Sequence, residues 1–407
     1  MKTIRKLRNA CVAIIAFGLT LSAQAGIITW DNGRGDGFLD SMTNWVGNVL
    51  PTTSDEVLLD NSVTNIPSTL ETSANLIYGD LIVNSTNGSV KISQKTAAQY
   101  KITLSGNGGS TAAIAAGGAT GDLVFLGNNY TNGTVEIGGG SGAAKLNQVI
   151  GTNGNFNVVN SGATLLIGNG GVLSGAFNLT KTGAGALTLE GNANTFGAGK
   201  TFELKAGTVN INGNKALGAA TCTFQIDGGT TINNTSGGPI TLNNNQPLTL
   251  NGDFTFTGST NLNLGTGATT LGTTAGASRT ITVSANTLTL GGAITNGATA
   301  NSIIKAGTGT LTLSGTNTFS GATIVTNGIL SLANASCLRS DTDIYIYSGA
   351  TNNLAFLGTN TIHSLIINGV PKFAGVYNAG NLVGYLTGGG NLRSTYPLPK
   401  GTMVSFF

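Results

Sequence analysis

Short apolar runs alternate with polar residues along most of the chain. In segments such as 101–104, 208–211 and 280–283, Leu, Ile or Val occupies every second position, with Thr, Asn or Lys between them. A period of two residues is typical of a β-strand with one buried face. Gly- and Asn-rich turns separate the runs, as at 106–109 and 138–140. Beyond residue 25 no segment has the period of an amphipathic helix, so the sequence predicts an all-β fold.

The extent of this pattern indicates a repetitive architecture. The runs continue from residue 76 to residue 360, which is too many strands for a single β-sandwich. In a solenoid each coil buries its apolar face against the next, so the pattern can continue. We predict a right-handed parallel β-helix with coils of roughly 20 to 28 residues. The alternative is two or three β-sandwich domains in series, but no Pro-rich or charged linker divides the chain.

Segment 1–25 has the three parts of a cleavable secretory signal peptide. Its basic residues are Lys2, Arg5, Lys6 and Arg8. An apolar run follows at 12–21, and Ala23 and Ala25 supply small residues at the −3 and −1 positions. We therefore expect export through the inner membrane and cleavage before Gly26, with a retained signal anchor as the alternative. The apolar run is short for a bilayer and no longer one follows, so we expect no membrane span in the mature chain.

The predicted organisation has five parts. They are a signal peptide at 1–25, an N-terminal capping segment at 26–75, a β-solenoid at 76–360, a closing unit at 361–395 and a tail at 396–407.

Charge excludes one class of partner. The whole chain has 19 Lys and Arg against 16 Asp and Glu, and the signal peptide holds four of the basic residues. The mature chain therefore has a net charge of −1, without the basic stripe that binds phosphates, and we expect no nucleic-acid partner. Only 9% of residues are charged and 40% are hydrophobic, a balance that disfavours intrinsic disorder.

Cysteine gives little information. Cys11 lies in the signal peptide, which leaves Cys222 and Cys337. They could form one disulfide in an oxidising compartment, but the usual burial of cysteine favours two free thiols.

One longer segment occurs twice. Residues 181–191, Lys-Thr-Gly-Ala-Gly-Ala-Leu-Thr-Leu-Glu-Gly, return in similar form at 305–315. Asn-Thr-Phe follows at 194–196 and 317–319, and then a strand at 207–211 and 328–332. Alternation places the leucines of each copy on one face: Leu187, Leu189, Leu311 and Leu313.

This pattern resembles the autotransporter-associated β-strand repeat, also called the passenger-associated transport repeat. The start of the chain also resembles the opening of secreted proteins that carry this repeat, through Trp30, Asp31, Asn44, Trp45, Pro51 and Asp55. Segments 365–370, 374–377 and 386–392 resemble their closing unit. The resemblance implies a β-helical passenger domain that assists secretion across, or folding outside, the outer membrane. Residues 393–407 cannot form the C-terminal barrel of a self-transporting protein, so the route across the outer membrane stays open.

The sequence offers little for catalysis. His363 is the single histidine, no Gly-x-Ser-x-Gly motif accompanies it, and alternation predicts an exposed strand position for it. One His with two distant Cys does not provide zinc-ligand spacing. The acids along the predicted solenoid are widely spread, and no pair at a single coil spacing stands out: Asp122, Glu136, Glu190, Glu203, Asp227 and Asp253. We therefore predict no catalytic, cofactor-binding or metal-ligating residue.

The acid-rich stretch lies near the N-terminus. Its members are Asp31, Asp36, Asp40, Asp55, Glu56 and Asp60. The segment 31–37 lacks the ligand order of a calcium loop, so a capping loop whose Asp and Asn side chains satisfy turn backbone is favoured. The tripeptide Arg34-Gly35-Asp36 is one that adhesion receptors of animal cells read, but it arises easily by chance in such a loop.

Two pairs of aromatic residues each allow two interpretations. Trp30 and Trp45 could form an exposed sugar platform, although plugging the open end of the solenoid is favoured. Tyr345 and Tyr347 share a strand face near the other end and allow the same two interpretations.

These observations favour an exported, non-catalytic structural or adhesive protein, at the cell surface or outside the cell, with the periplasm as an alternative. We expect polysaccharide or a second copy of the chain as partner, and no cofactor. The main alternative is a polysaccharide-active β-helix lyase or hydrolase, which would need carboxylates that converge in one groove. A secreted part of a larger system, anchored by a partner, is a third hypothesis.

Overall fold

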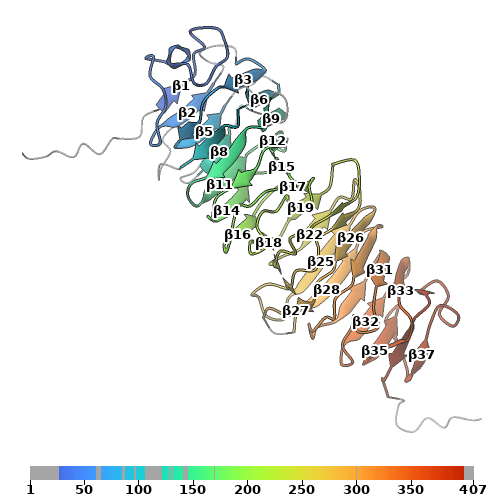
Figure 1. Cartoon of the computed structure of the whole chain (residues 1–407). Coiled ribbons are helices and arrows are strands. Elements are labelled where there is room, and N and C mark those ends of the chain that lie inside the picture. Colours follow the sequence, from blue (N-terminus) through green and yellow to red (C-terminus); the bar gives the residue numbers. More distant parts are fainter. Residues whose placement is uncertain are drawn as a thin grey trace, which may run out of the picture.

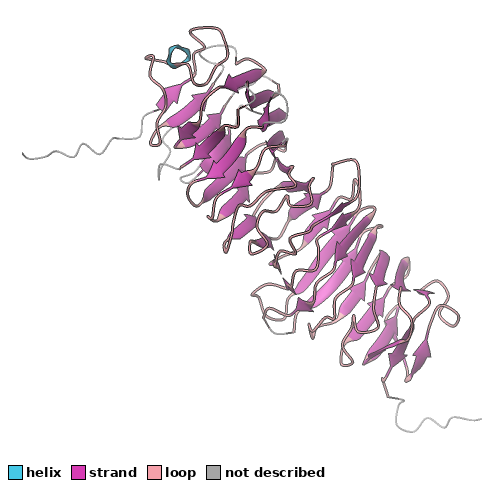
Figure 2. Ribbon diagram, viewed as in Figure 1, coloured by secondary structure: helices cyan, strands magenta, loops and turns pink. Residues whose placement is uncertain are grey.

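The computed structural model forms an elongated rod, with its N-terminal strands at one end and its C-terminal strands at the other (Figure 1). It describes residues 27–60, 66–84, 88–95, 98–105, 122–127, 130, 132–140, 145–168, 170–298 and 300–397. The predicted signal peptide, the turn at 106–109 and the end of the tail, 398–407, lie outside the described residues. Strands run through the whole rod (Figure 2), and its described residues form one 3₁₀ helix, η1 (Met42–Asn44), and no α-helix. No helix in these ranges is long and apolar enough to span a membrane.

The first face of the rod is an 11-stranded sheet. In spatial order its strands are β1 (Ile27–Thr29), β2 (Glu56–Leu59), β5 (Asp80–Val83), β8 (Asp122–Leu126), β11 (Gly154–Val158), β14 (Leu179–Thr182), β16 (Thr201–Leu204), β18 (Thr223–Ile226), β21 (Leu248–Leu250), β24 (Thr269–Thr270) and β27 (Ile294–Thr295).

The second face is a 14-stranded sheet. In spatial order its strands are β3 (Thr69–Thr72), β6 (Val90–Gln94), β9 (Asn132–Gly140), β12 (Gly162–Gly168), β15 (Ala186–Leu189), β17 (Thr208–Ile211), β19 (Thr230–Asn233), β22 (Phe254–Phe256), β25 (Ser278–Val283), β28 (Ser302–Ala306), β30 (Thr323–Val325), β32 (Asp343–Ile346), β35 (Ser364–Ile367) and β36 (Val370–Lys372).

Shorter sheets complete the rod. A four-stranded sheet forms the third face of the N-terminal half: β13 (Leu173–Ser174), β10 (Asn147–Ile150), β7 (Lys101–Leu104) and β4 (Leu76–Tyr78). A seven-stranded sheet forms a further face of the C-terminal half: β20 (Ile240–Thr241), β23 (Leu262–Asn263), β26 (Thr287–Leu290), β29 (Thr310–Leu313), β31 (Gly328–Leu332), β33 (Ala350–Leu354) and β38 (Leu386–Gly388). A three-stranded sheet closes the C-terminal end: β34 (Thr359–Ile362), β39 (Asn391–Ser394) and β37 (Gly375–Tyr377).

Successive strands lie on successive faces, as β2, β3 and β4 do, and each turn stacks on the one before it. Consecutive turns pair in parallel, as in β16 with β18 and β26 with β29. The predicted parallel β-solenoid is therefore confirmed. Antiparallel pairs among the described strands occur only at the C-terminal end, where β36 folds back on β35 and β37 on β39.

The length of a turn varies along the rod. One outward row of the 11-stranded sheet pairs Thr180 with Glu203, Gln225, Thr249, Thr270 and Thr295 in succession. The spacing between members of this row changes from turn to turn but stays inside the predicted range. The N-terminal half departs from it, because Leu81 pairs with Val124, well beyond the predicted length of one coil. The prediction of coil length is thus confirmed for the centre of the solenoid and wrong for this N-terminal turn.

One continuous hydrophobic core runs through the rod. The predicted inward leucines of the repeat are buried: Leu187, Leu189, Leu311 and Leu313. Phe202 and Phe224 stack in adjacent turns with ring centroids 5.3 Å apart. Cys222 and Cys337 are both buried and both free, which confirms the favoured interpretation of the thiols.

The two copies of the sequence repeat lie on different faces. Lys181 lies in β14 of the 11-stranded sheet, whereas Lys305 lies in β28 of the 14-stranded sheet. In the 11-stranded sheet, β27 is the fifth strand after β14, and β28 is the strand that follows β27 along the chain. The offset between the copies therefore corresponds to five turns plus one face. The repeat encodes two strands and the corner between them, not a position on a particular face.

Candidate functional site

The N-terminal carboxylates accept hydrogen bonds from their own loops and from a neighbouring turn. Asp31 Oδ1 accepts the N–H of Gly33 at 2.9 Å, and Asp55 Oδ2 accepts the N–H of Thr52 at 2.8 Å. Asp40 Oδ2 accepts both the N–H and the hydroxyl of Ser73, at 3.1 and 2.6 Å. This geometry is that of the predicted capping loop, in which carboxylates satisfy turn backbone.

Asp36 of the Arg-Gly-Asp tripeptide is also engaged internally. Its Oδ2 lies 2.9 Å from Nε of Arg34, and its Oδ1 accepts hydrogen bonds from Asn44 Nδ2 at 2.5 Å and from the N–H of Phe38 at 3.1 Å. Of the remaining acids of this stretch, Glu56 is buried and Asp60 accepts a hydrogen bond from Asn84 at 3.3 Å. The described part of the chain contains no group of three or more His, Cys, Asp or Glu side chains that could hold a metal ion.

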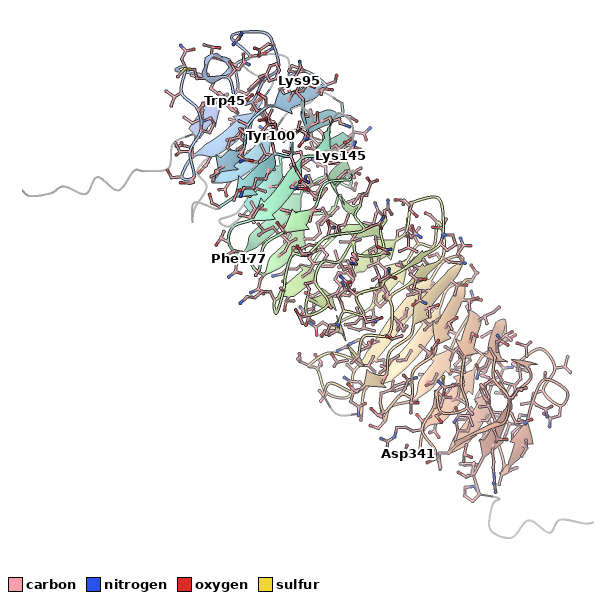
Figure 3. All side chains as sticks on the ribbon, in the orientation of Figure 1. Trp45, Lys95, Tyr100, Lys145, Phe177 and Asp341 are labelled. Atoms are coloured by element: carbon pink, nitrogen blue, oxygen red, sulfur yellow. The ribbon has the colours of Figure 1, made fainter. Side chains whose placement is uncertain are left out.

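Trp30 and Trp45 lie inside the N-terminal end of the rod, where Figure 3 shows Trp45. Both indoles are fully buried and meet edge to face with centroids 5.2 Å apart. Trp45 also packs edge to face on Tyr78 at 6.2 Å and donates from Nε1 to the carbonyl of Leu39 at 3.0 Å. Buried rings cannot stack on a sugar, so the prediction that they plug the solenoid is confirmed.

Glu203 and Asp227 converge on the outer surface of the 11-stranded sheet. Nε2 of Gln225 donates to Oε1 of Glu203 at 3.0 Å and to Oδ1 of Asp227 at 3.1 Å. Partial burial raises the pKa of Glu203, and the negative charge of Asp227 raises it further. The prediction that no pair of acids stands out at a single coil spacing is therefore wrong. The two acids belong to adjacent turns, where Glu203 pairs with Gln225 and Asp227 lies two positions further along the chain.

The other predicted acids do not join this pair. Glu136 forms an ion pair with Lys91 at 2.8 Å, and Asp253 accepts the N–H of Thr280 at 2.8 Å. Glu190 directly follows β15 on another face. The backbone of Asp122 belongs to β8, and its side chain lies outside the described atoms. Among the five acids whose side chains are described, the structure thus brings two together, Glu203 and Asp227.

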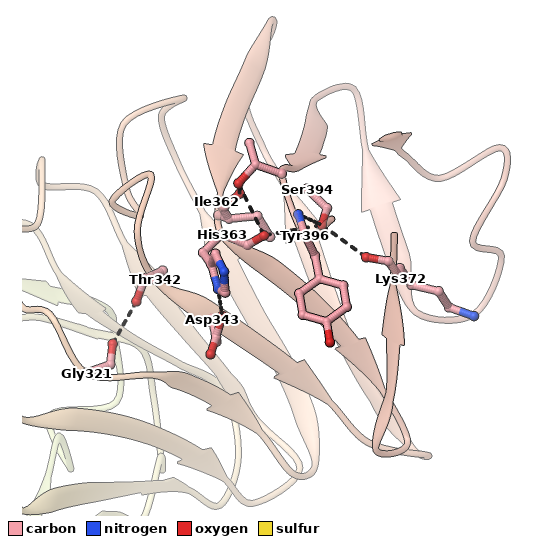
Figure 4. Close-up of polar contacts among 9 residues, drawn as sticks. Gly321, Thr342, Asp343, Ile362, His363, Lys372, Ser394 and Tyr396 are labelled. Atoms are coloured by element: carbon pink, nitrogen blue, oxygen red, sulfur yellow. Dashed lines mark hydrogen bonds and ion pairs between the residues drawn. The ribbon is translucent and has the colours of Figure 1, made fainter. Parts of the chain in front are cut away.

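His363 lies in the bend between β34 and β35, not within a strand as predicted, because the chain turns a corner there. The predicted exposure is confirmed. Its Nδ1 lies 2.7 Å from Oδ1 of Asp343, and its ring meets Tyr396 edge to face at 6.0 Å (Figure 4). The nearby Ser394 hydroxyl donates to the carbonyl of Lys372 at 3.1 Å. That bond directs the hydroxyl to the backbone, so these residues do not form a nucleophile–base arrangement.

Tyr345 and Tyr347 differ from the buried tryptophans. Tyr345 points outward from β32 and is half-buried, and Tyr347 is 41% exposed. The structure therefore excludes the interpretation that this pair plugs the end of the solenoid.

The outer surface of the seven-stranded sheet is uncharged. Its strands contain no Asp, Glu, Lys or Arg, whereas both longer sheets contain several. One row, here called the Thr/Asn ladder, runs across all seven strands in register: Thr241, Asn263, Thr289, Thr312, Ser331, Asn353 and Thr387. Its members are partly or fully exposed except Ser331, which is 7% exposed. Asn353 donates to the hydroxyl of Ser331 at 3.1 Å and accepts from Thr387 at 3.3 Å.

Comparison with known proteins identifies the repeat. The family description "Passenger-associated-transport-repeat" matches residues 179–211 and 303–332. The chain carries two passenger-associated transport repeats. It is also 35% identical over 167 residues to "Adhesin BmaC autotransporter" of Brucella suis biovar 1 (strain 1330). That alignment covers 41% of this chain and 4% of the relative, so the chain spans a small fraction of the relative's length. No solved structure matches the chain.

The lysine of each passenger-associated transport repeat is buried and caps the backbone carbonyl groups where the chain turns from one face of the solenoid to the next. Lys181 and Lys305 have no exposed surface, and each ammonium group donates to three backbone carbonyl oxygens. The acceptors of Lys181 are Thr182, Gly183 and Ala206, at 2.6, 2.9 and 3.2 Å. Those of Lys305 are Ala306, Gly307 and Asn327, at 2.8, 2.7 and 3.1 Å. Burial lowers the pKa of Lys181 to about 7 and that of Lys305 to about 8, while the carbonyl oxygens favour the ammonium form.

The asparagine of each repeat joins neighbouring turns. Asn317 is buried, accepts the N–H of Ile294 at 2.9 Å and donates to the carbonyl of Cys337 at 2.8 Å. Asn194 makes the equivalent bonds to Leu173 and Ala216. The passenger-associated transport repeats therefore supply corner caps and cross-turn bridges, which is a structural role.

Proposed function

We propose that this chain is a non-catalytic, adhesive β-solenoid displayed at the cell surface or released outside the cell. The Thr/Asn ladder carries the proposal, because it is a broad uncharged surface of hydroxyl and amide groups. Such groups recur about every 4.8 Å along the rod and suit hydrogen bonding to a polymer of similar chemistry. The passenger-associated transport repeats support placement outside the cell, and the printed name of the relative supports adhesion.

Retention of the purified protein on immobilised extracellular and plant polysaccharides tests this proposal. We expect retention of the native chain on at least one polysaccharide, without release of shortened or unsaturated products. Thr289→Lys and Thr312→Lys place charges on the Thr/Asn ladder and should reduce retention at least tenfold. The matched control is Thr249→Lys, on an outward row of the 11-stranded sheet. Equal loss in the control, or no retention of the native chain, would contradict the proposal.

A polysaccharide-active enzyme is the second candidate, and the Glu203–Asp227 pair favours it. Two neighbouring carboxyl groups, one of them with a raised pKa, are the arrangement that glycosidases use for acid and base. Product release that the Glu203→Gln variant lacks would establish this candidate in place of the first.

A further inference from the structure

An apolar row interrupts the polar outer surface of the 14-stranded sheet near its C-terminal end. Outward residues pair across neighbouring strands in the order Ile304, Ile324, Tyr345, Ile366 and Pro371. We call these residues the Tyr345 row. The position before the row in the same register is Thr280, so the change from polar to apolar takes place within one continuous row.

The Tyr345 row does not contribute to the core. On each parallel strand the residues on either side of the row point inward and are buried, as with Ile344 and Ile346 beside Tyr345. Ile304, Ile324 and Tyr345 are partly exposed, while Ile366 is 7% exposed. Three partly exposed apolar side chains in register, about 4.8 Å apart, form a strip about 10 Å long on the surface.

Polar groups border the strip at Tyr345. Residues two positions apart on a strand point to the same face of the sheet. Asp343 therefore lies before Tyr345 on the outer face, and Tyr347, which is 41% exposed, lies after it. Oδ1 of Asp343 lies 2.7 Å from Nδ1 of His363, and the Tyr396 ring packs against that histidine (Figure 4). The aromatic group continues with Phe373, which stacks on Tyr396 at 6.2 Å and is 38% exposed.

This arrangement matches the chemistry of a sugar ring. A pyranose presents apolar C–H faces and carries hydroxyl groups around its edge, so it fits an apolar strip with hydrogen-bonding groups beside it. The carboxylate of Asp343 accepts hydrogen bonds from hydroxyl groups and repels an anionic polymer. We infer that the Tyr345 row binds the ring faces of a neutral polysaccharide, with Asp343 and His363 holding its hydroxyl groups. This inference rests on the proposed adhesive function and assigns it a second surface, distinct from the Thr/Asn ladder.

The test compares variants of the purified protein on neutral mannan, xylan and β-glucan and on anionic polygalacturonate. Tyr345→Ser and Ile324→Thr remove the apolar strip; Thr is tolerated because Thr280 occupies the same row. Tyr345→Phe keeps the ring, and Thr231→Ala, outward on the same sheet, is the matched control. Melting temperatures and far-ultraviolet circular dichroism establish that each variant folds.

We expect the native protein to bind a neutral polymer more tightly than polygalacturonate. Tyr345→Ser should weaken this binding at least tenfold, and Tyr345→Phe and Thr231→Ala should stay within threefold of the native protein.

Three outcomes would overturn the inference in different ways. Unchanged binding in folded Tyr345→Ser and Ile324→Thr, together with loss in Thr289→Lys, would reject the Tyr345 row and leave adhesion standing. Absence of binding by the native protein would reject both proposals. Loss of self-association in Tyr345→Ser, seen by light scattering with polysaccharide binding unchanged, would show that a second copy of the chain covers the row.

Discussion

The buried lysine of the second repeat allows a quantitative test of how the corners are held. In Lys305→Met the unbranched side chain still fills the space, but the three carbonyl oxygens within 2.7–3.1 Å lose their charged donor. Hydrogen bonds from a charged group contribute roughly 1.5–3 kcal/mol each. Burial of the ammonium group opposes them: lowering its pKa from 10.5 to about 8 corresponds to about 3 kcal/mol. The balance predicts that Lys305→Met lowers local stability by about 2–5 kcal/mol.

Hydrogen exchange measures this loss where it occurs, because a solenoid opens locally. The amides of Gly309 and Thr326 are suitable reporters, since they bond to the turn before at 2.8 and 3.0 Å. Their opening free energy should fall in Lys305→Met, and that of amides near Lys181 should not. Lys200→Met, at an exposed lysine, should change stability by less than about 0.5 kcal/mol. If Gly309 and Thr326 exchange at the same rate in Lys305→Met and in the native protein, the hydrogen bonds from Lys305 to the three carbonyl oxygens do not stabilise the corner.

Further predictions concern the same architecture. Burial lowers the folded-state pKa of Lys305 to about 8, so the unfolded chain binds more protons than the folded chain between about pH 8 and 10.5. The stability of the native protein should therefore rise with pH across this window, relative to that of Lys305→Met. Denaturation of both proteins from pH 7 to 10 measures this, and a difference in unfolding free energy that does not change with pH would contradict it. Gly307→Ala should lower stability by about 1–3 kcal/mol or more, since φ is 77° and the new Cβ would lie 2.3 Å from the carbonyl oxygen of Val283; an unchanged melting temperature would contradict this. Asn317→Ala should cost about 2–4 kcal/mol by leaving two buried backbone groups unpaired, as measured by denaturant titration, and a loss under about 1 kcal/mol would count against it. Burial raises the pKa of Cys222 to about 12, so iodoacetamide at pH 8 should label it only after denaturation, and mass spectrometry of the native protein would detect any earlier labelling.

Local pattern was sufficient to predict the architecture. Alternation of Leu with Thr, as in β26 and β29, specifies which side chains enter the core, because the side-chain period of a strand is two. The burial of Leu187 and Leu311 and the free state of Cys222 and Cys337 follow from such local preferences. The repeated Lys-x-Gly-x-Gly segment likewise forms equivalent corners at both places in the rod.

Neighbours across turns could not be predicted in this way. Glu203 and Asp227 meet, and Tyr345 lines up with Ile324, because each turn stacks on the previous one with a particular register. That register depends on turn lengths that vary along a single row and are much greater near the N-terminus, where Leu81 pairs with Val124. The strands stay paired in one row while the length of the turn changes, so the spacing along the sequence does not by itself say which side chains are neighbours. The sequence by itself therefore determined the strands, their buried faces and the solenoid. Only the tertiary structure decided which outward side chains share a surface, since that depends on the length of each turn and on the strand register between adjacent turns.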